Sequence, residues 1–282
     1  MFKRTKGFVG IILVIVLTSC TSSRVESDAD SQIILQTLTP ANATVRQPYQ
    51  IEEVTEEVKL ANPKTVYRQG PTASGGVSWL AAKVDNGSPK LERVRYMLAY
   101  DQFGNFLSKE LIPGSEELIP SSPIIYQYGA RPQRGAVFFP SRITRYGADC
   151  GGCKPNESGE AYTASGVAVS SNTAVRQMDG TWQDGIKYEG YYVLASSSSL
   201  PLCTIVEISN HKFSGMGLKP GVPFKAIILD RGVSGRKLDL YVGTETNISN
   251  VRETSRMYPR ATIIGFANYT KNSMGQRICK VN

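Results

Sequence analysis

The sequence contains one histidine, His211, and this scarcity excludes several classes of enzyme. A Ser-His-Asp triad needs a histidine beside its nucleophile. His211 lies between Asn210 and Lys212 in a loop-like stretch that predicts a surface position. The chain also has no dense block of lysine and arginine, the usual footprint of a nucleic-acid-binding protein. We therefore expect no nucleic-acid partner, and we expect the protein to work without a cofactor.

Long apolar runs are absent too. The run Phe8–Leu17 has about 10 residues, whereas a transmembrane helix needs roughly 20. Residues 3–6 carry three positive charges and no acid, and a basic start before a short apolar core is typical of a secretion signal. The run ends in Leu-Thr-Ser-Cys, which resembles the bacterial lipobox, in which the cysteine, here Cys20, is acylated and becomes the new N-terminus. The alternative is an ordinary signal peptide with a chance cysteine.

The lipobox implies an exported protein that is anchored at Cys20 to a bacterial membrane and faces the cell wall. The resulting lipid chains are sufficient for stable attachment. The net charge of +8 falls to +5 when the three basic residues of the signal are removed. A mildly basic exported protein suits an anionic wall or membrane surface, although ordinary solubility explains the charge equally well.

Composition divides the chain into four segments: a lipoprotein signal at 1–20, a flexible polar tether at 21–48, a small all-β module at 49–132 and a β-barrel domain at 133–282. The tether is rich in Ser, Thr, Asp, Gln and Ala and has no clear period. In the module, residues 94–100 alternate, turn residues occupy 101–105, and an apolar run resumes, which predicts a hairpin. Residues 92–132 resemble the glycine-containing adhesion module that often precedes wall-cleaving domains; a generic all-β spacer is the alternative.

The segment from 133 onward predicts short strands separated by Gly, Ser, Asn and Pro. No long amphipathic helix is present in the pattern, and only a short helix is expected within 243–259. A mainly β fold with a compact barrel follows. The expected strands cover residues 136–139, 166–169, 191–195, 204–208, 224–229, 238–242 and 262–266.

Three segments of this half carry a family resemblance. The first is "TRYGADCGGC" at 144–153, followed by "TASGV" at 163–167. The second contains "LPLCT" at 200–204, and the third contains "LDRG" at 229–232 and "KLDLYVG" at 237–243. The ordered set resembles the 3D (three-aspartate) domain, a six-stranded double-psi β-barrel shared with lytic transglycosylase A and, more distantly, with rare lipoprotein A. The resemblance covers about half of the chain.

The sequence departs from that family in two places. The first family aspartate falls on Ser196, where rare lipoprotein A often has a histidine. The interval from Asp230 to Asp239 is also shorter than in typical 3D domains, and in this respect the segment resembles rare lipoprotein A more closely. Both departures bear on activity more than on fold.

The resemblance implies peptidoglycan glycan strands as the substrate and lytic transglycosylation as the reaction. One protonated carboxyl group donates its proton to the glycosidic oxygen, and the resulting carboxylate takes a proton from the muramic 6-hydroxyl, which closes a 1,6-anhydro ring. The family pattern implies Asp239 as this acid and base, with Asp230 as its partner or substitute. The structural alternative is that Asp230 caps a turn and that Asp239 pairs with Arg231 or Arg236.

The same resemblance implies substrate contacts from Tyr146, Thr163, Ser196 and Arg236. Tyr146 could stack on a sugar ring or bond to it, or it could be a half-buried strand tyrosine. We expect the protein to be a monomer.

Besides Cys20 the chain has four cysteines, an even number that suggests disulfides in an exported protein. Four cysteines allow three pairings. We favour Cys150–Cys153 with Cys203–Cys279; Cys203 replaces a family glycine. A four-cysteine zinc site is the alternative, and it is disfavoured because the chain has a single Cys-x-x-Cys.

Two functions from other classes remain open beside the enzyme. One is a non-catalytic peptidoglycan-binding lipoprotein, in which Ser196 marks a lost activity. The other is a structural envelope or adhesion protein, which would have no paired carboxylates in a cleft.

Overall fold

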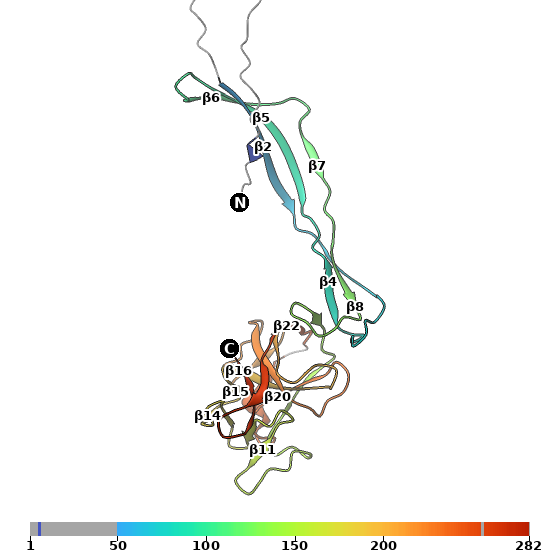
Figure 1. The fold of residues 1–282 in the computed structure, drawn as a ribbon, viewed down its shortest axis with the longest axis vertical. Helices are drawn as coiled ribbons and strands as arrows, with labels where there is room; N and C mark the ends of the chain where they lie inside the picture. Colours follow the sequence, from blue (N-terminus) through green and yellow to red (C-terminus); the bar gives the residue numbers. More distant parts are fainter. Residues whose placement is uncertain (1–4, 7–49, 255–256, 282) are drawn as a thin grey trace, which may run out of the picture. The chain divides into compact units, whose positions relative to one another are not determined.

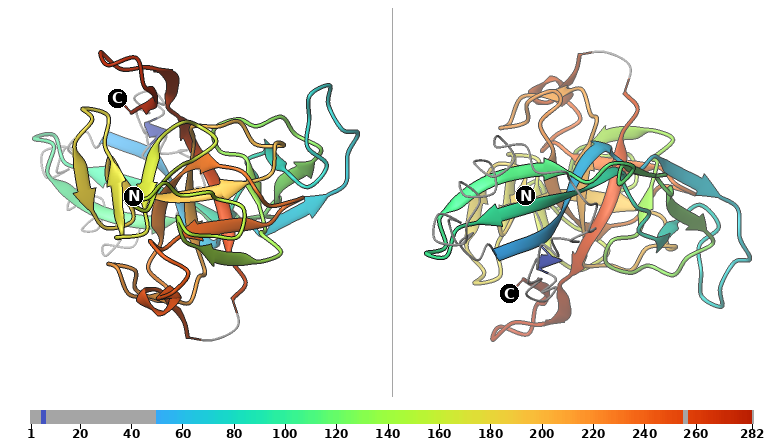
Figure 2. Two further views of the ribbon diagram at one scale, coloured as in Figure 1. Left: turned by 90° about the horizontal axis from the view of Figure 1, so that it is seen from below. Right: turned by 90° about the horizontal axis from the view of Figure 1, so that it is seen from above.

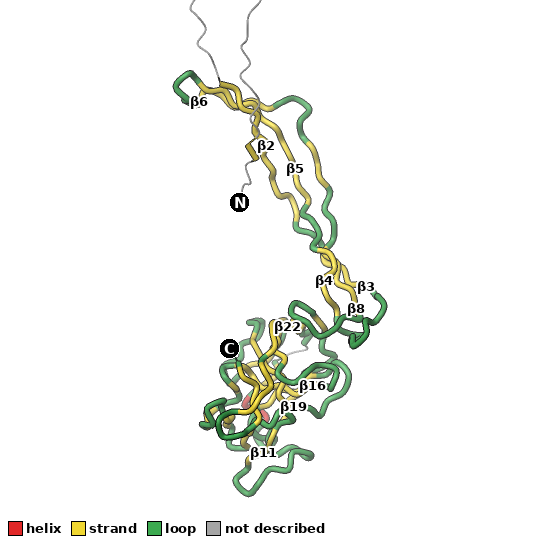
Figure 3. The backbone as a smooth tube through the Cα atoms, in the orientation of Figure 1, coloured by secondary structure: helices red, strands yellow, loops and turns green. Residues whose placement is uncertain are grey.

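The structure, a computed structural model, describes residues 5–6, 50–254 and 257–281. Strands and loops make up almost all of this part, and its single helix is a short 3-10 turn, η1 (Ile248–Asn250), within the range expected for one (Figure 3). The mainly β fold predicted from the sequence is therefore confirmed. Cys20 and the tether lie outside the described residues. Among the described residues no helix has the length and apolar character needed to cross a membrane.

The chain divides into two compact units: Met1–Lys64 with Gly87–Ser122, and Thr65–Asn86 with Pro123–Asn282. We call them the N-terminal and the C-terminal unit. This division cuts through the predicted 49–132 module, because three of its strands pair with the large sheet of the C-terminal unit. The predicted boundary between 132 and 133 therefore does not coincide with the boundary of either unit. These three strands are β3 (Thr65–Arg68), β4 (Ala81–Asp85) and β8 (Ile124–Tyr128).

The N-terminal unit is one antiparallel sheet with β5 at its centre (Figure 1). β5 pairs with β2 along almost its whole length, and β6 and β7 both pair with its other edge. The predicted hairpin is confirmed as β5 and β6, with residues 101–105 as its turn. The strands are β1 (Thr5–Lys6), β2 (Gln50–Ala61), β5 (Lys90–Tyr100), β6 (Phe106–Leu111) and β7 (Glu117–Ile119). Because β1 lies in the predicted signal, we expect the mature protein to lack it.

Four ion pairs link the strands of this sheet, whereas few of its apolar side chains are buried. Arg93 contacts both Glu57 at 2.9 Å and Glu117 at 3.1 Å, and so links β2, β5 and β7. Arg95 contacts Glu53 at 3.0 Å, and Lys109 contacts Glu56 at 2.8 Å. In β2 and β5 only Val54 and Val94 are buried.

The C-terminal unit contains a mixed sheet in which eleven strands are joined. The part that matters for function is the run β10-β20-β16-β19-β17-β22, in which β10 is parallel to β20 and β16 is parallel to β19. Within the described residues β10 is the last strand at its end of the sheet. These strands are β10 (Ile143–Tyr146), β16 (Tyr191–Ser196), β17 (Thr204–Ser209), β19 (Phe224–Asp230), β20 (Leu238–Tyr241) and β22 (Arg260–Phe266).

All seven strands expected in this half are present, each within a few residues of the expected range. Besides β16, β17, β19, β20 and β22 they are β9 (Val137–Phe138) and β12 (Ala168–Ser170). β16 and β19 are buried over nearly their whole length, as expected for parallel neighbours covered on both faces.

The sequence pattern did not predict several shorter strands. β10 was not expected as a strand, nor was most of a small antiparallel sheet in the order β11-β12-β13-β14. The C-terminal hairpin, dark red in both views of Figure 2, was also not expected. The remaining strands are β11 (Glu160–Tyr162), β13 (Ala174–Arg176), β14 (Trp182–Asp184), β15 (Lys187–Tyr188), β18 (Phe213–Ser214), β21 (Arg252–Glu253), β23 (Asn268–Lys271) and β24 (Arg277–Lys280).

One buried tyrosine ties the small sheet to the large one. Tyr241, on β20, is completely buried, and its hydroxyl donates to the Ser170 carbonyl at 2.5 Å and accepts the Ser170 N–H at 3.2 Å. A buried hydroxyl that bonds to backbone in this way fixes the position of both elements. It therefore fixes β20, the strand that carries Asp239, against β12.

Candidate active site

Asp239 and Asp230 are brought together by three paired strands. In the pair β20–β16, Asp239 is opposite Ala195, and in the pair β16–β19, Ala195 is opposite Asp230. Residues directly opposite one another point to the same face of a sheet. The two carboxylates thus share a face with only a methyl group between them. Two strand spacings put their Cα atoms ~10 Å apart.

A β-bulge precedes Asp230. The register of β16 and β19 shifts between Leu194 and Ala195, so that Leu229 is the extra residue. The carbonyl of Leu229 accepts the N–H of Ser165 at 2.8 Å, which holds the turn at 163–166 against β19. A bulge changes the direction in which the following side chains point. Here the extra residue places Asp230 opposite Ala195, on the same face of the sheet as Asp239.

Asp230 accepts two backbone hydrogen bonds. Its Oδ1 accepts a hydrogen bond from the backbone N–H of Ala164 at 2.9 Å and another from the backbone N–H of Arg231 at 2.8 Å. The turn-capping alternative for Asp230 is therefore present in the structure, and it coexists with the position beside Asp239.

Asp239 lies in different surroundings. The pKa of its carboxyl is raised to about 6, mainly by burial and also by the negative charges of Glu245 and Asp230, whereas hydrogen bonds from the Thr144 side chain and the Leu240 backbone oppose the shift. Its Oδ1 is buried and has no hydrogen-bond partner among the described residues. The alternative in which Asp239 pairs with Arg231 or Arg236 is not formed, since every ion pair of the described chain lies in the N-terminal unit. Asp239 can therefore hold a proton near neutral pH.

Tyr146 is buried, with 6% of its surface exposed, and packs edge-on against Tyr241 at 5.8 Å between ring centroids. Stacking of this ring on a sugar is therefore not possible in the structure, and that expectation is corrected. Its buried hydroxyl lies beside the Asp230 carboxyl but forms no hydrogen bond of good geometry with a described residue. Burial raises the pKa of the phenol well above its ordinary value, and the charges of Asp230 and Asp239 add to this effect. Tyr146 is thus a neutral group beside the two acids.

Ser196 is also buried. Its hydroxyl donates to the Ser197 carbonyl at 3.0 Å and accepts from the Arg231 guanidinium at 3.1 Å. The same guanidinium donates to the Leu200 carbonyl at 2.9 Å. The expected substrate contact from Ser196 is corrected: this residue anchors Arg231, which in turn holds the 197–203 loop.

The other two residues expected to contact the substrate are Thr163, which is buried, and Arg236, which is exposed to solvent. Thr163 is buried, and its hydroxyl donates to the Val167 carbonyl at 3.0 Å, so it stabilises the 163–167 turn and does not reach solvent. Its expected substrate contact is corrected for that reason. Arg236 is exposed in the loop between β19 and β20. It is the one member of the four that is accessible to a substrate.

His211 was predicted at the surface, and this is wrong. The ring is completely buried; its Nε2 lies 2.6 Å from the Val222 carbonyl, and its Nδ1 accepts the N–H of Phe213 at 3.2 Å. The acceptor role of Nδ1 places the proton on Nε2. Burial lowers the pKa of the imidazole. His211 therefore closes a loop in its neutral form.

Both favoured cysteine pairs are present as disulfides, Cys150–Cys153 and Cys203–Cys279. The four sulfurs are thus divided between two bonds, which leaves no four-thiolate site for zinc. Within the described residues no group of three or more His, Cys, Asp or Glu side chains is arranged to hold a metal ion.

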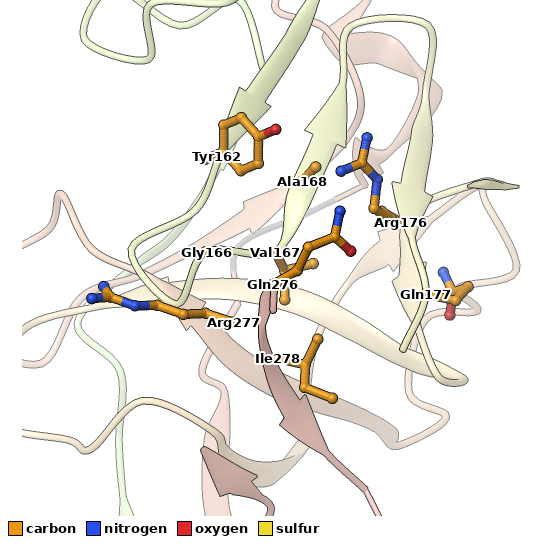
Figure 4. A pocket seen from close by; sticks show the side chains of 9 residues that line it. All are labelled: Tyr162, Gly166, Val167, Ala168, Arg176, Gln177, Gln276, Arg277 and Ile278. Carbon is orange, nitrogen blue, oxygen red and sulfur yellow. The ribbon is translucent and has the colours of Figure 1, made fainter. Parts of the chain in front are cut away.

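A separate pocket of about 210 Å³ lies in the C-terminal unit, between the 162–168 turn, β13 and β24 (Figure 4). Neither aspartate lines it. Sequence reasoning did not identify its polar residues, because they come from short strands with no clear alternation. They are Tyr162, Arg176, Gln177, Gln276 and Arg277.

Comparison of this chain with known protein families, curated proteins and solved structures finds no match.

Proposed function

We propose that the protein cleaves peptidoglycan glycan strands by lytic transglycosylation, with Asp239 as the acid and base. The observation that carries the proposal is the contrast between two aspartates on one face of a sheet. Asp239 has a pKa of about 6 and a free buried oxygen, whereas Asp230 is held by two backbone donors. Two carboxyl groups whose surroundings differ in this way are the usual basis of acid and base assignments.

In the reaction, the protonated carboxyl of Asp239 donates its proton to the glycosidic oxygen as the bond to the anomeric carbon breaks. Its carboxylate then removes the proton of the muramic 6-hydroxyl, whose oxygen attacks the anomeric carbon and closes the 1,6-anhydro ring. The acid ends in its starting state, and no water is consumed. The charge of Asp230 on the same face favours the protonated form of Asp239 at the start and stabilises positive charge at the anomeric carbon.

We further propose that β10, β20, β16, β19, β17 and β22 form a six-stranded double-psi barrel of the 3D type. The support is twofold: the six strands are consecutive in one sheet that mixes parallel and antiparallel pairs, and the motifs resembling the 3D domain fall on these strands and their loops. The N-terminal unit would serve as the adhesion or spacer module.

The test uses the protein without residues 1–20 and purified peptidoglycan, with products identified by mass spectrometry. Wild type should release 1,6-anhydro muropeptides, Asp239→Asn should release none, and Asp230→Asn should be slowed at least tenfold. Asp184→Asn, which removes an exposed aspartate of β14, is the matched control and should act like wild type. Products with ordinary reducing ends would instead indicate hydrolysis, which uses two carboxyl groups and a water.

A non-catalytic peptidoglycan-binding lipoprotein is the second candidate. It is favoured by the burial of Ser196 and Tyr146 and by the fact that the aspartates do not line the described pocket. Sacculi that stay intact and still retain the protein would establish this function and exclude the enzyme.

Anchoring at Cys20 is a proposal as well, tested by cell fractionation. We expect wild type in the membrane fraction and Cys20→Ser in the soluble exported fraction or uncleaved. A Cys20→Ser protein that is processed normally and stays on the membrane would contradict the lipid anchor.

A further inference from the structure

The pocket in Figure 4 is basic and contains no acid. Arg176 of β13 and Arg277 of β24 line it, and no aspartate or glutamate does. Neither guanidinium forms an ion pair with a described residue, since the ion pairs of the described chain all lie in the other unit. Two unneutralised guanidinium groups at one pocket favour an anionic ligand.

Both arginines are held in place by their neighbours. Arg176 lies over the ring of Trp182 at 4.8 Å from its centroid, on the adjacent strand of the hairpin. The stem of Arg277 lies against Gly166, where a Cβ would come within 2.8 Å of the Arg277 Cβ. Gly166 has φ of +87°, so the close approach and the backbone conformation both require glycine. Trp182 thus positions the Arg176 guanidinium, whereas Gly166 contacts only the stem of Arg277, whose guanidinium extends away from that of Arg176 (Figure 4).

Neutral donors complete the lining. The Gln276 Oε1 accepts from Asn272, which leaves the amide NH2 of Gln276 available to donate into the pocket beside Arg176 (Figure 4). The side-chain NH2 of Gln177, by contrast, already donates to the backbone carbonyls of Val175 and Lys187. Gln177 therefore lines the pocket without a free donor for a ligand. Tyr162, 64% exposed, stands at the rim. The donor set of planar guanidinium and amide groups matches a carboxylate, which accepts two parallel N–H bonds.

The pocket is adjacent to the proposed active site through one short turn. Ala164 donates its N–H to Asp230 at 2.9 Å, and Gly166, two residues later, contacts Arg277. Two residues span at most ~7 Å of extended chain. In peptidoglycan the stem peptide is attached to the muramic acid whose glycosidic bond would be cleaved. A carboxylate of that peptide is therefore the anionic group that a strand bound at the aspartates would bring to this pocket.

We propose that this pocket binds a free carboxylate of the peptidoglycan stem peptide, so that the protein acts on peptide-bearing strands in preference to bare glycan. This inference rests on the proposed function for its substrate. The volume of about 210 Å³ equals that of roughly seven waters at ~30 Å³ each, enough for a carboxylate with part of its residue.

The first experiment measures binding without catalysis, by calorimetry on the protein lacking residues 1–20. The probe is the synthetic peptide L-Ala-D-Glu-L-Lys-D-Ala with free carboxylates, and its fully amidated form is the comparison. We expect the amidated peptide to bind at least tenfold more weakly, and Arg176→Gln and Arg277→Gln each to weaken binding of the free peptide about tenfold. Arg277→Lys, which retains charge and stem but loses the planar fork, should restore part of the loss. Lys219→Gln, an exposed charge elsewhere in the unit, is the control and should bind normally.

Equal binding of the two peptides, or normal binding by both arginine variants, would overturn the inference. Displacement by inorganic phosphate at concentrations where acetate has no effect would overturn the carboxylate assignment. Thermal melting of each variant separates loss of binding from loss of fold.

The second experiment separates this inference from the proposed function. Release of 1,6-anhydro ends is measured on intact strands and on strands whose peptides an amidase has removed. We expect stripped strands to be cleaved at least tenfold more slowly, with the arginine variants slowed on intact strands only. Cleavage of both substrates at equal rates would contradict the peptide-binding role of the pocket but would be consistent with the proposed enzyme activity. Absence of anhydro products together with normal peptide binding would contradict the proposed enzyme activity but would support the peptide-binding role of the pocket.

Discussion

At the scale of single residues, the state of Asp239 governs the proposed reaction. The carboxyl must begin protonated, and its pKa is about 6. We expect the rate of glycan cleavage to be constant below about pH 6 and to fall about tenfold for each pH unit above it. The measurement is the initial rate of anhydro-end release between pH 4.5 and 8. A rate that rises through this range would assign the limiting proton transfer to a base and contradict the role of Asp239.

The raised pKa of Asp239 also makes a prediction about stability. Its folded pKa of about 6 exceeds its ordinary value of 3.8, so the folded chain binds the proton more tightly than the unfolded chain does. Between these pH values folding takes up a proton, and stability falls as pH rises through the interval. Asp239→Asn, which cannot ionise, should gain about 1–2 kcal/mol at pH 7.5, allowing for solvent screening, and almost nothing at pH 4.

Thermal melting at the two pH values checks this prediction. The control is again Asp184→Asn, which removes an exposed carboxyl of β14. A gain from Asp239→Asn of equal size at both pH values would mean that packing, not ionisation, is responsible.

Sequence reasoning selected the two aspartates from motifs in a fixed order, and strand pairing places both on one face of a sheet. It could not supply what distinguishes them, since burial of Asp239 and the two backbone donors to Asp230 arise only from the fold. His211 is a second residue whose surroundings the sequence did not reveal, because it was predicted to be exposed and is buried. Its polar neighbours in sequence predict a surface loop, yet its ring packs edge-on at 4.8 Å against Phe224 from another strand. Local polarity does not reveal a tertiary contact.

At the scale of elements, the disulfide from Cys203 to Cys279 joins β24 to the start of β17. It closes a loop with a sequence separation of 76, against 3 for Cys150–Cys153. Loop entropy makes the longer bridge worth about 4 kcal/mol and the shorter one about 2. Replacing Cys203 and Cys279 by alanine should therefore lower stability in urea unfolding much more than the same change at Cys150 and Cys153.

Cys203 offers a matched variant, because its φ is +66°, in the left-handed region where glycine is favoured. With Cys279→Ala in both proteins, Cys203→Gly should be about 1 kcal/mol more stable than Cys203→Ala. If alanine is the more stable of the two, the left-handed backbone at this position is not a source of strain.

Strands with β-branched, near-continuous apolar sequences were predicted well because burial on both faces leaves an unambiguous pattern. β16 and β19 are the examples, as expected for neighbours in a parallel pair. The sheet β11-β14 was largely missed, because its strands are three residues long and mix polar, aromatic and small side chains. Such strands are set by the hairpin register and by contacts such as that of Tyr241 with Ser170. The pocket residues escaped prediction for the same reason.

At the scale of the whole molecule, the two units differ in the side-chain interactions that they contain. In β2 and β5 the buried residues are Val54 and Val94, and the sheet carries the ion pairs of Arg93, Arg95 and Lys109. The C-terminal unit has a large apolar core and no ion pair among its described residues. The first kind of interaction is screened by salt and the second is not.

Hydrogen exchange should therefore respond to salt in one unit only. Raising sodium chloride from about 0.1 M to about 1 M shortens the screening length from ~10 Å to ~3 Å. Since half-exposed ion pairs contribute about 0.2–1 kcal/mol each, amides of β2 and β5 should exchange a few times faster, while those of β16 and β19 stay unchanged. Arg93→Gln, which removes the contacts with Glu57 and Glu117, should speed exchange in β2 and β5 at low salt and reduce the effect of added salt. Exchange in β2 and β5 that is indifferent to salt would mean that backbone pairing along the β2–β5 register stabilises this sheet without help from its charges.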